Sequence, residues 1–310
     1  MTESTASSIN ANVKSESVNY IPEVRRMMYG FGDCSEPLIE SAKIINSVVQ
    51  RQMKSIVYEA SKIADMRDSQ IVEERDFLFL LRRDKTQLQR LLKYLDLKDF
   101  KSSINKVLDS ELNDDLLDDT QNNAKKKSSH RKFIESIDTI GVLTDSENHI
   151  DYVKRNREIR AELASRKMDS LQYLEYSKAR AASFANKYNH KFESWIATDN
   201  DIKISKSSYT ILGYLAFETV AQIMDLAFLV RQDQSKIHGD SLDRLRFSFY
   251  NPYTYKPHQY GKGTSVKPIT PAEINEALRR FWSPQLDTMG PFQRRSIHRQ
   301  DCKFLAFETT

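Results

Sequence analysis

The sequence predicts an all-α protein built from two helical blocks, and three observations predict it. Its 310 residues include 8 glycines and 8 prolines, well below the roughly 12% that these two residues reach in an average chain. So few turn residues disfavour sandwiches, barrels and doubly wound sheets. Two long segments carry apolar residues at helical spacing. The length favours about two domains, at roughly 150 residues each.

The first helical block spans residues 21–108 and follows a polar tail, residues 1–20, that we expect to be disordered. A short helix, 22–28, ends at the sequence YGFGD of residues 29–33. A long helix and two shorter ones follow, so the plan is short, long, short, with a helical extension at the end. The long helix is predicted from apolar residues three or four positions apart: Leu38, Ala42, Ile45, Val49, Met53, Ile56, Ala60 and Ile63.

Two runs of opposite charge predict a linker at residues 109–150. Residues 109–119 hold six acids and no base, and neither this run nor the basic one that follows can form a core. The basic run is either a nuclear import signal or a plain solvated linker. Its basic residues are Lys125, Lys126, Lys127, Arg131 and Lys132.

The second helical block repeats the plan of the first. A helical lead-in, 151–182, precedes a block at 183–285 that contains an insertion, 238–267, and residues 286–310 form a C-terminal extension. The last helix begins with Thr270 as its cap, Pro271 next and Glu273 three residues after the cap. Short-long-short helices are the layout of the histone fold. We therefore predict two histone folds in one chain that form an intramolecular pair; two unrelated helical bundles are the alternative.

The long helix of the second block, residues 208–231, has two distinct faces. At about 100° per residue, one arc faces the other block and joins Ile45, Val49, Met53 and Ile56 in a pairing core. The arc consists of Leu212, Ala216, Val220, Ile223, Ala227 and Val230. Glu218 and Asp225 lie on the opposite side, with Tyr214 and Gln222 beside them. These polar residues argue against a membrane span, although 20 apolar-rich residues are about long enough for one.

The sequence contains no constellation of residues that predicts catalysis. The six histidines are dispersed, and two cysteines, Cys34 and Cys302, cannot form a four-thiolate zinc site. The sequence GKGT at 261–264 lacks the earlier glycine and the preceding strand of a phosphate-binding loop. We expect no enzyme activity, cofactor, metal or small-molecule ligand. The net charge of +4 is too small to predict wrapping of DNA.

Long collinear strings of residues resemble the Suppressor of Ty protein three family. RRMMYGFGD at 25–33 and FLLRRD at 79–84 are similar to TATA-binding-protein-associated factor thirteen. YLAFETVAQ at 214–222, with INEALRR at 274–280, is similar to the distal, factor-eleven-like histone fold of the family. The resemblance covers roughly residues 22–108 and 166–310. Histone folds of this kind pair an arginine with an acid of the third helix, here Arg67 and Asp76, although these are two residues further apart than usual.

The resemblance implies a non-enzymatic subunit of a SAGA-type coactivator in the nucleus. Such a subunit would bind TATA-binding protein, help deliver or regulate it at RNA polymerase II promoters, and contact other histone-fold and scaffold subunits. It would bind DNA little; a histone-like, sequence-independent DNA-binding protein is the alternative. Glu218 and Asp225, with Tyr214 and Gln222, are then candidates to dock a basic surface of TATA-binding protein. Otherwise the two acids pair with bases inside the protein, such as Arg279.

Overall fold

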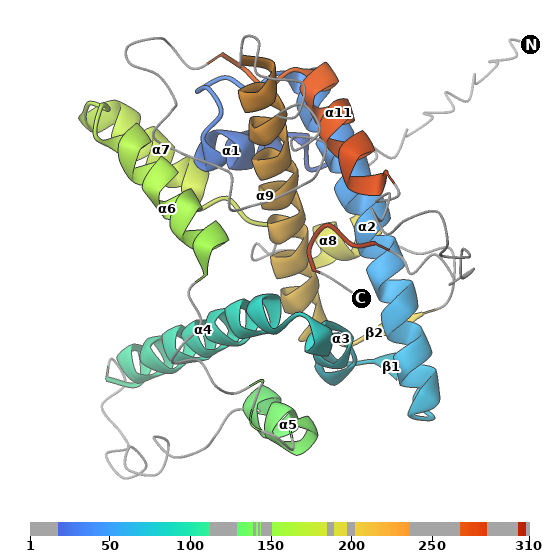
Figure 1. The fold of residues 1–310 in the computed structure, drawn as a ribbon. Coiled ribbons are helices and arrows are strands. Elements are labelled where there is room, and N and C mark those ends of the chain that lie inside the picture. The colour runs from blue at the N-terminus through green and yellow to red at the C-terminus, as the bar shows by residue number, and fades with distance from the viewer. Residues whose placement is uncertain are drawn as a thin grey trace, which may run out of the picture.

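The computed structural model describes residues 18–111, 129–138, 141, 143, 151–184, 189–196, 202–235, 267–283 and 303–307. These residues are mostly helical (Figure 1), as the sequence predicts. The described residues leave out most of the predicted tail, the charged run at 112–128, nearly all of the insertion and most of the C-terminal extension. The elements are α1 (Ile21–Phe31), α2 (Ile39–Met66), β1 (Ile71–Val72), α3 (Glu74–Leu80), the 3-10 helix η1 (Leu81–Arg83), α4 (Lys85–Glu111), α5 (Ser129–Ile137), α6 (Tyr152–Ser165), α7 (Ser170–Arg180), α8 (Asn189–Ile196), β2 (Lys203–Ile204), α9 (Ser208–Ser235) and α11 (Pro271–Trp282).

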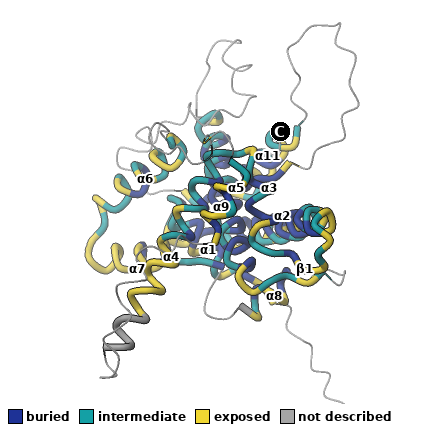
Figure 2. The backbone as a smooth tube through the Cα atoms, turned by 90° about the horizontal axis from the view of Figure 1, so that it is seen from below, coloured by how far each residue is buried: buried dark blue, intermediate teal, exposed yellow. Residues whose placement is uncertain are grey.

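The two long helices, α2 and α9, pack against each other at the centre of the molecule (Figure 1). All nine residues proposed for the pairing core are 0% exposed, and they belong to one continuous hydrophobic core. They are Ile45, Val49, Met53, Ile56, Leu212, Ala216, Val220, Ile223 and Ala227. Both blocks therefore contribute to a single core. Buried positions concentrate on α2 and α9, whereas much of α6, α7 and the distal part of α4 is exposed (Figure 2).

Loops from the two blocks join at both ends of the central helices. At one end β1, between α2 and α3, pairs in parallel with β2, between α8 and α9, through Val72 and Ile204. At the other end the Ile269 amide donates to Asp33 Oδ1 at 3.0 Å. The Ser41 hydroxyl donates to the Ile269 carbonyl at 2.7 Å. At each end of the central helices, a loop of one block therefore contacts a loop of the other.

An arginine–acid clamp closes the third helix onto the central helix in each block. The expected pair of Arg67 and Asp76 is confirmed, with Nη2 of the arginine 2.9 Å from Oδ2 of the acid. In the second block Arg231, near the end of α9, pairs with Glu273 at 2.7 Å. Glu273 also completes the capping box with Thr270 that the sequence predicts. The sequence analysis missed the second clamp, because the two residues are 42 positions apart.

The YGFGD sequence ends α1 where that helix meets α6 and α7. Gly32 has φ +114° in the left-handed region, which favours glycine, and a Cβ atom there would lie 3.0 Å from Cδ of Arg160. A Cβ atom on Gly30 would lie 3.2 Å from the backbone of Ala179 in α7. The two glycines therefore allow the lead-in helices to approach α1 closely.

Helix α9 has the length and apolar composition of a membrane span. Among the described helices it alone has both, and 83% of its apolar window is buried inside the protein. A core helix has this pattern, because its apolar surface is covered by other helices instead of lipid.

Candidate partner-binding site

The four residues proposed for partner contact lie on one side of α9, where α4 and α6 cover it. Glu218 is buried and only 7% exposed. Both acids form ion pairs with arginines of α4 and α6. Their partners do not include Arg279, which bonds Glu276 on its own helix at 2.6 Å. The structure therefore favours the internal role for these acids, but with different bases from those named above.

Arg157 of α6 lies at the centre of this ion network. Its Nη1 atom is 2.9 Å from Glu218 Oε2, and its Nε atom is 2.6 Å from Asp225 Oδ2. Its Nη2 atom donates to Gln222 Oε1 at 3.5 Å. One guanidinium thus bonds three side chains spaced along α9, and this fixes α6 against that helix.

Two further arginines extend the network on either side of Arg157. Arg90 of α4 lies 3.3 Å from Glu218 and also pairs with Asp151, whose side chain caps the start of α6. Arg160 pairs with Asp225 at 2.6 Å, and its guanidinium lies 4.8 Å from the centre of the Phe228 ring. Three bases and three acids therefore join α4, α6 and α9 without net charge.

Two acids of the network, Asp225 and Asp151, stay ionised because of their partners. Burial alone would raise the pKa of Asp225, but the Arg157 and Arg160 guanidinium groups outweigh it and lower the pKa below its usual value. Burial and Arg90 act in the same opposed way on Asp151, and its pKa is also lowered. Tyr214 lies beside Glu218, and burial first, then the Glu218 charge, raises the pKa of its hydroxyl well above 10.0. It therefore stays neutral.

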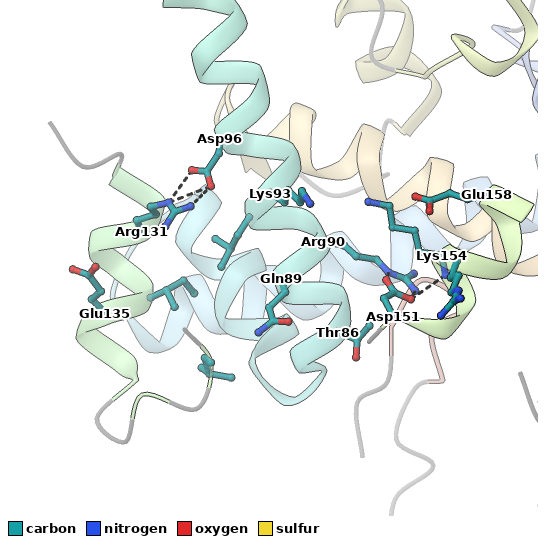
Figure 3. Close-up of a pocket in the computed structure, with 14 residues that line it drawn as sticks. Thr86, Gln89, Arg90, Lys93, Asp96, Arg131, Glu135, Asp151, Lys154 and Glu158 are labelled. Carbon is teal, nitrogen blue, oxygen red and sulfur yellow. Dashed lines mark hydrogen bonds and ion pairs between the residues drawn. The ribbon is translucent and has the colours of Figure 1, made fainter. Parts of the chain in front are cut away.

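Two pockets flank the network and offer binding surface. The larger, about 670 Å³, lies between α4, α5 and α6 (Figure 3). The smaller, about 350 Å³, lies where α1, α4, α6, α7 and α9 meet. Arg90, Lys93, Lys154 and Glu158 line both pockets. Within the described residues no group of three or more histidine, cysteine or acidic side chains could hold a metal ion.

The basic residues proposed for nuclear import are only partly described. Lys125, Lys126 and Lys127 lie outside the described residues. Arg131 and Lys132 belong to α5, where Arg131 Nε donates to Asp96 Oδ1 at 2.9 Å. That bond holds α5 against α4 and so places the second half of the basic run on a helix.

Three pairs of adjacent arginines within the described residues, at 25–26, 82–83 and 279–280, could mark a DNA surface, but at least one arginine of each pair bonds within the protein. Arg25 donates to the Pro37 carbonyl at 2.9 Å, and Arg82 donates to the Phe79 carbonyl at 2.7 Å. Arg280 bridges Asp233 and Glu276. The ion pairs of Arg280 reduce the positive charge available to phosphates, whereas the bonds of Arg25 and Arg82 to carbonyls hold their side chains in place and leave their charge intact.

Sequence reasoning missed the three arginines and Asp151 in the network. Arg157 and Arg160 are three residues apart, so they share a helix face, but α6 is polar on several sides and no pattern selects them. Arg90 lies 128 residues from Glu218. The signal that existed was indirect: two acids in a helix that is otherwise apolar imply buried bases elsewhere in the chain.

Comparisons with known proteins relate the chain to transcription subunits. Residues 18–110 match the family described as transcription initiation factor IID, 18kD subunit. The chain is 29% identical over 274 residues to SAGA complex subunit Spt3 of Drosophila melanogaster, which covers 85% of this chain and 67% of that protein. It is 26% identical over 305 residues to SAGA complex subunit SPT3 of Saccharomyces cerevisiae, covering 84% and 90%. It is also 32% identical over 87 residues to transcription initiation factor TFIID subunit 13 of Arabidopsis thaliana, covering 28% and 68%.

Proposed function

Since the chain belongs to the Spt3 family, we propose that it is a subunit of a SAGA-type coactivator complex that acts in transcription initiation. The observation that carries this proposal is similarity along most of the chain to proteins named as SAGA subunits. The role is a scaffold and not an enzyme, and its partners are other histone-fold and scaffold subunits. Transcription initiation by RNA polymerase II takes place in the nucleus, so we place the protein there.

We also infer that the chain folds as two paired histone folds. The first, within 21–108, consists of α1, α2 and α3 and lies inside the match to the factor IID subunit. The second, within 183–285, consists of α8, α9 and α11. Three observations support the inference: the repeated helix plan, the parallel joint between β1 and β2, and the arginine–acid clamp present in both blocks.

We further propose that the chain binds TATA-binding protein. Glu218 and Asp225 contribute to this binding by holding Arg90, Arg157 and Arg160, so that α4 and α6 present a fixed surface beside α9. Tyr214 and Gln222 belong to the same contact region. The ion pairs of both acids support this indirect role over direct docking of a basic surface.

The experiment that tests partner binding is a pull-down of the full chain with purified TATA-binding protein across a salt series. We expect saturable binding that persists near physiological salt. Random duplex DNA serves as the comparison, because sequence-independent binding to phosphates weakens steeply as salt rises. Binding to DNA alone, with no capture of TATA-binding protein, would show that the histone-like DNA-binding alternative is right.

Replacing Lys125, Lys126 and Lys127 by alanine is expected to reduce nuclear import several-fold, because import signals are recognised through clustered positive charge. A fluorescent fusion of the full chain measures the ratio of nuclear to cytoplasmic signal. Alanine at Lys54, Lys62 and Lys101 removes the same charge outside the cluster and serves as the control. Equal localisation of both triple variants and the parent would mean that the cluster is only a solvated linker.

A further inference from the structure

Four aromatic side chains line the smaller pocket, two from α9 and one each from α1 and α4, and we call them its aromatic floor. Phe31 of α1 and Phe217 of α9 lie with ring centres 5.0 Å apart, and Tyr94 of α4 and Tyr214 of α9 lie at the same distance. All four side chains are half-buried. The volume of about 350 Å³ falls within the range of ligand pockets, roughly 300–1,000 Å³. The pocket can therefore accept a few apolar side chains.

An exposed apolar stripe on α4 continues from the edge of this pocket. Leu97 lines the pocket and is 61% exposed, and Phe100 and Ile104 are 63% and 42% exposed. Positions i, i+3 and i+7 share one face of a helix. Large apolar side chains that gather on an exposed face mark an interaction surface. We call the pocket and this stripe together the helical groove.

The rim of the helical groove carries excess positive charge. Six bases and two acids line the pocket: Arg90, Lys93, Lys154, Arg157, Arg160 and Arg180, with Glu158 and Glu218. The ion network neutralises three of the arginines. The remaining charged residues of the pocket are three bases, Lys93, Lys154 and Arg180, and one acid, Glu158. Lys93 and Lys154 are exposed, extend from the facing helices α4 and α6 (Figure 3), and form no ion pair with another described residue.

We propose that the helical groove binds an acidic, amphipathic peptide segment of a partner protein. The apolar side chains of the segment enter the pocket and cover Leu97 and Phe100, and its carboxylates meet Lys93, Lys154 and Arg180. An aromatic floor with a basic rim matches a helix that has an apolar face and acidic flanks. Segments in which acidic and apolar residues alternate are typical of disordered activation domains. The groove and its charge stand whether or not the chain binds TATA-binding protein.

The test uses the full chain and a fluorescein-labelled synthetic peptide of 20 residues, with leucine and phenylalanine at helical spacing and aspartate elsewhere. Fluorescence anisotropy should show saturable binding, and two control peptides, with aspartate changed to asparagine or leucine to serine, should bind weakly. Lys93→Glu with Lys154→Glu should weaken binding about tenfold or more, because two attractions become repulsions. Leu97→Ser with Phe100→Ser should weaken it about as much, through lost apolar contact.

Matched variants separate the groove from general effects. Lys43→Glu with Lys178→Glu reverses two exposed charges on α2 and α7 outside the helical groove, and Leu171→Ser with Leu174→Ser removes exposed apolar side chains of α7. Both should retain the parent affinity. No saturable binding, or equal loss in the groove and control variants, would overturn the proposal.

The acidic run of the chain itself is the other possible occupant. A variant with asparagine at Asp114, Asp115, Asp118 and Asp119 tests this possibility, because it removes the negative charge of the run. Unchanged affinity for the probe in this variant supports a partner segment. Binding that appears only in this variant would mean that the run of the chain fills the groove, and the proposal would be wrong.

Discussion

Residues 1–108 and residues 151–310, expressed separately, are expected to give aggregated or molten material, and co-expression is expected to restore a folded pair. Helices α2 and α9 contribute to one continuous core, in which Val49 and Val220 are both 0% exposed. Separation would expose that apolar surface to water at a cost of about 25 cal/mol per Å². A domain is stable by only about 5–15 kcal/mol, so neither half retains enough core to fold alone.

Near-ultraviolet circular dichroism and size-exclusion chromatography of each half measure this outcome. The control is the full chain with a protease site placed within residues 112–128. After cleavage the two pieces should stay associated and melt cooperatively, because the core and not the linker holds them. Monomeric elution and a sharp melting transition for each separate half would show that the blocks are independent bundles.

The sequence predicted most of the central fold, because helical periodicity reports burial directly. The stripe from Ile45 to Ile56 and the arc from Leu212 to Ala227 are buried, and the capping signal at Thr270 marks the true start of α11. The sequence offered a pairing of Arg67 with Asp76 that departs from the usual histone spacing, and the structure has it. These features depend on residues that are close in sequence or on a regular repeat.

The candidate site was harder to predict, because its contacts join distant segments. Helix arithmetic placed Glu218 and Asp225 away from the pairing core, and the expected alternatives were a partner or a base inside the protein such as Arg279. It could not show that α6 and α4 pack over that face, because neither helix has a single apolar face that indicates which helix it packs against. Charge count alone could not distinguish a paired acid from a free one. Only the three-dimensional arrangement identifies Arg157 as the base between them.

Glu218→Lys is expected to destabilise the protein and, with it, to abolish the proposed binding to TATA-binding protein. The new ammonium group would face Arg90 and Arg157, both of which lie within 3.3 Å of the present carboxylate. Breaking a buried ion pair by removing one partner costs about 3–5 kcal/mol. At roughly 2–4 °C per kcal/mol, the melting midpoint should fall on the order of 10 °C. The melting midpoint of Glu218→Gln should fall less, because glutamine keeps the shape of the side chain and only leaves the arginines less well paired.

Glu158→Lys is the matched control, because this exposed acid of α6 undergoes the same change of charge without a buried partner. Its melting midpoint should stay within about 2 °C of the parent, as surface substitutions change stability by no more than about 0.5 kcal/mol. Thermal melting and the pull-down are measured on the same preparations of all three variants. Loss of binding by Glu218→Lys at an unchanged midpoint would instead mean that Glu218 touches TATA-binding protein directly. In that case the ion network would have to open when the partner binds, because Glu218 is only 7% exposed in the free chain.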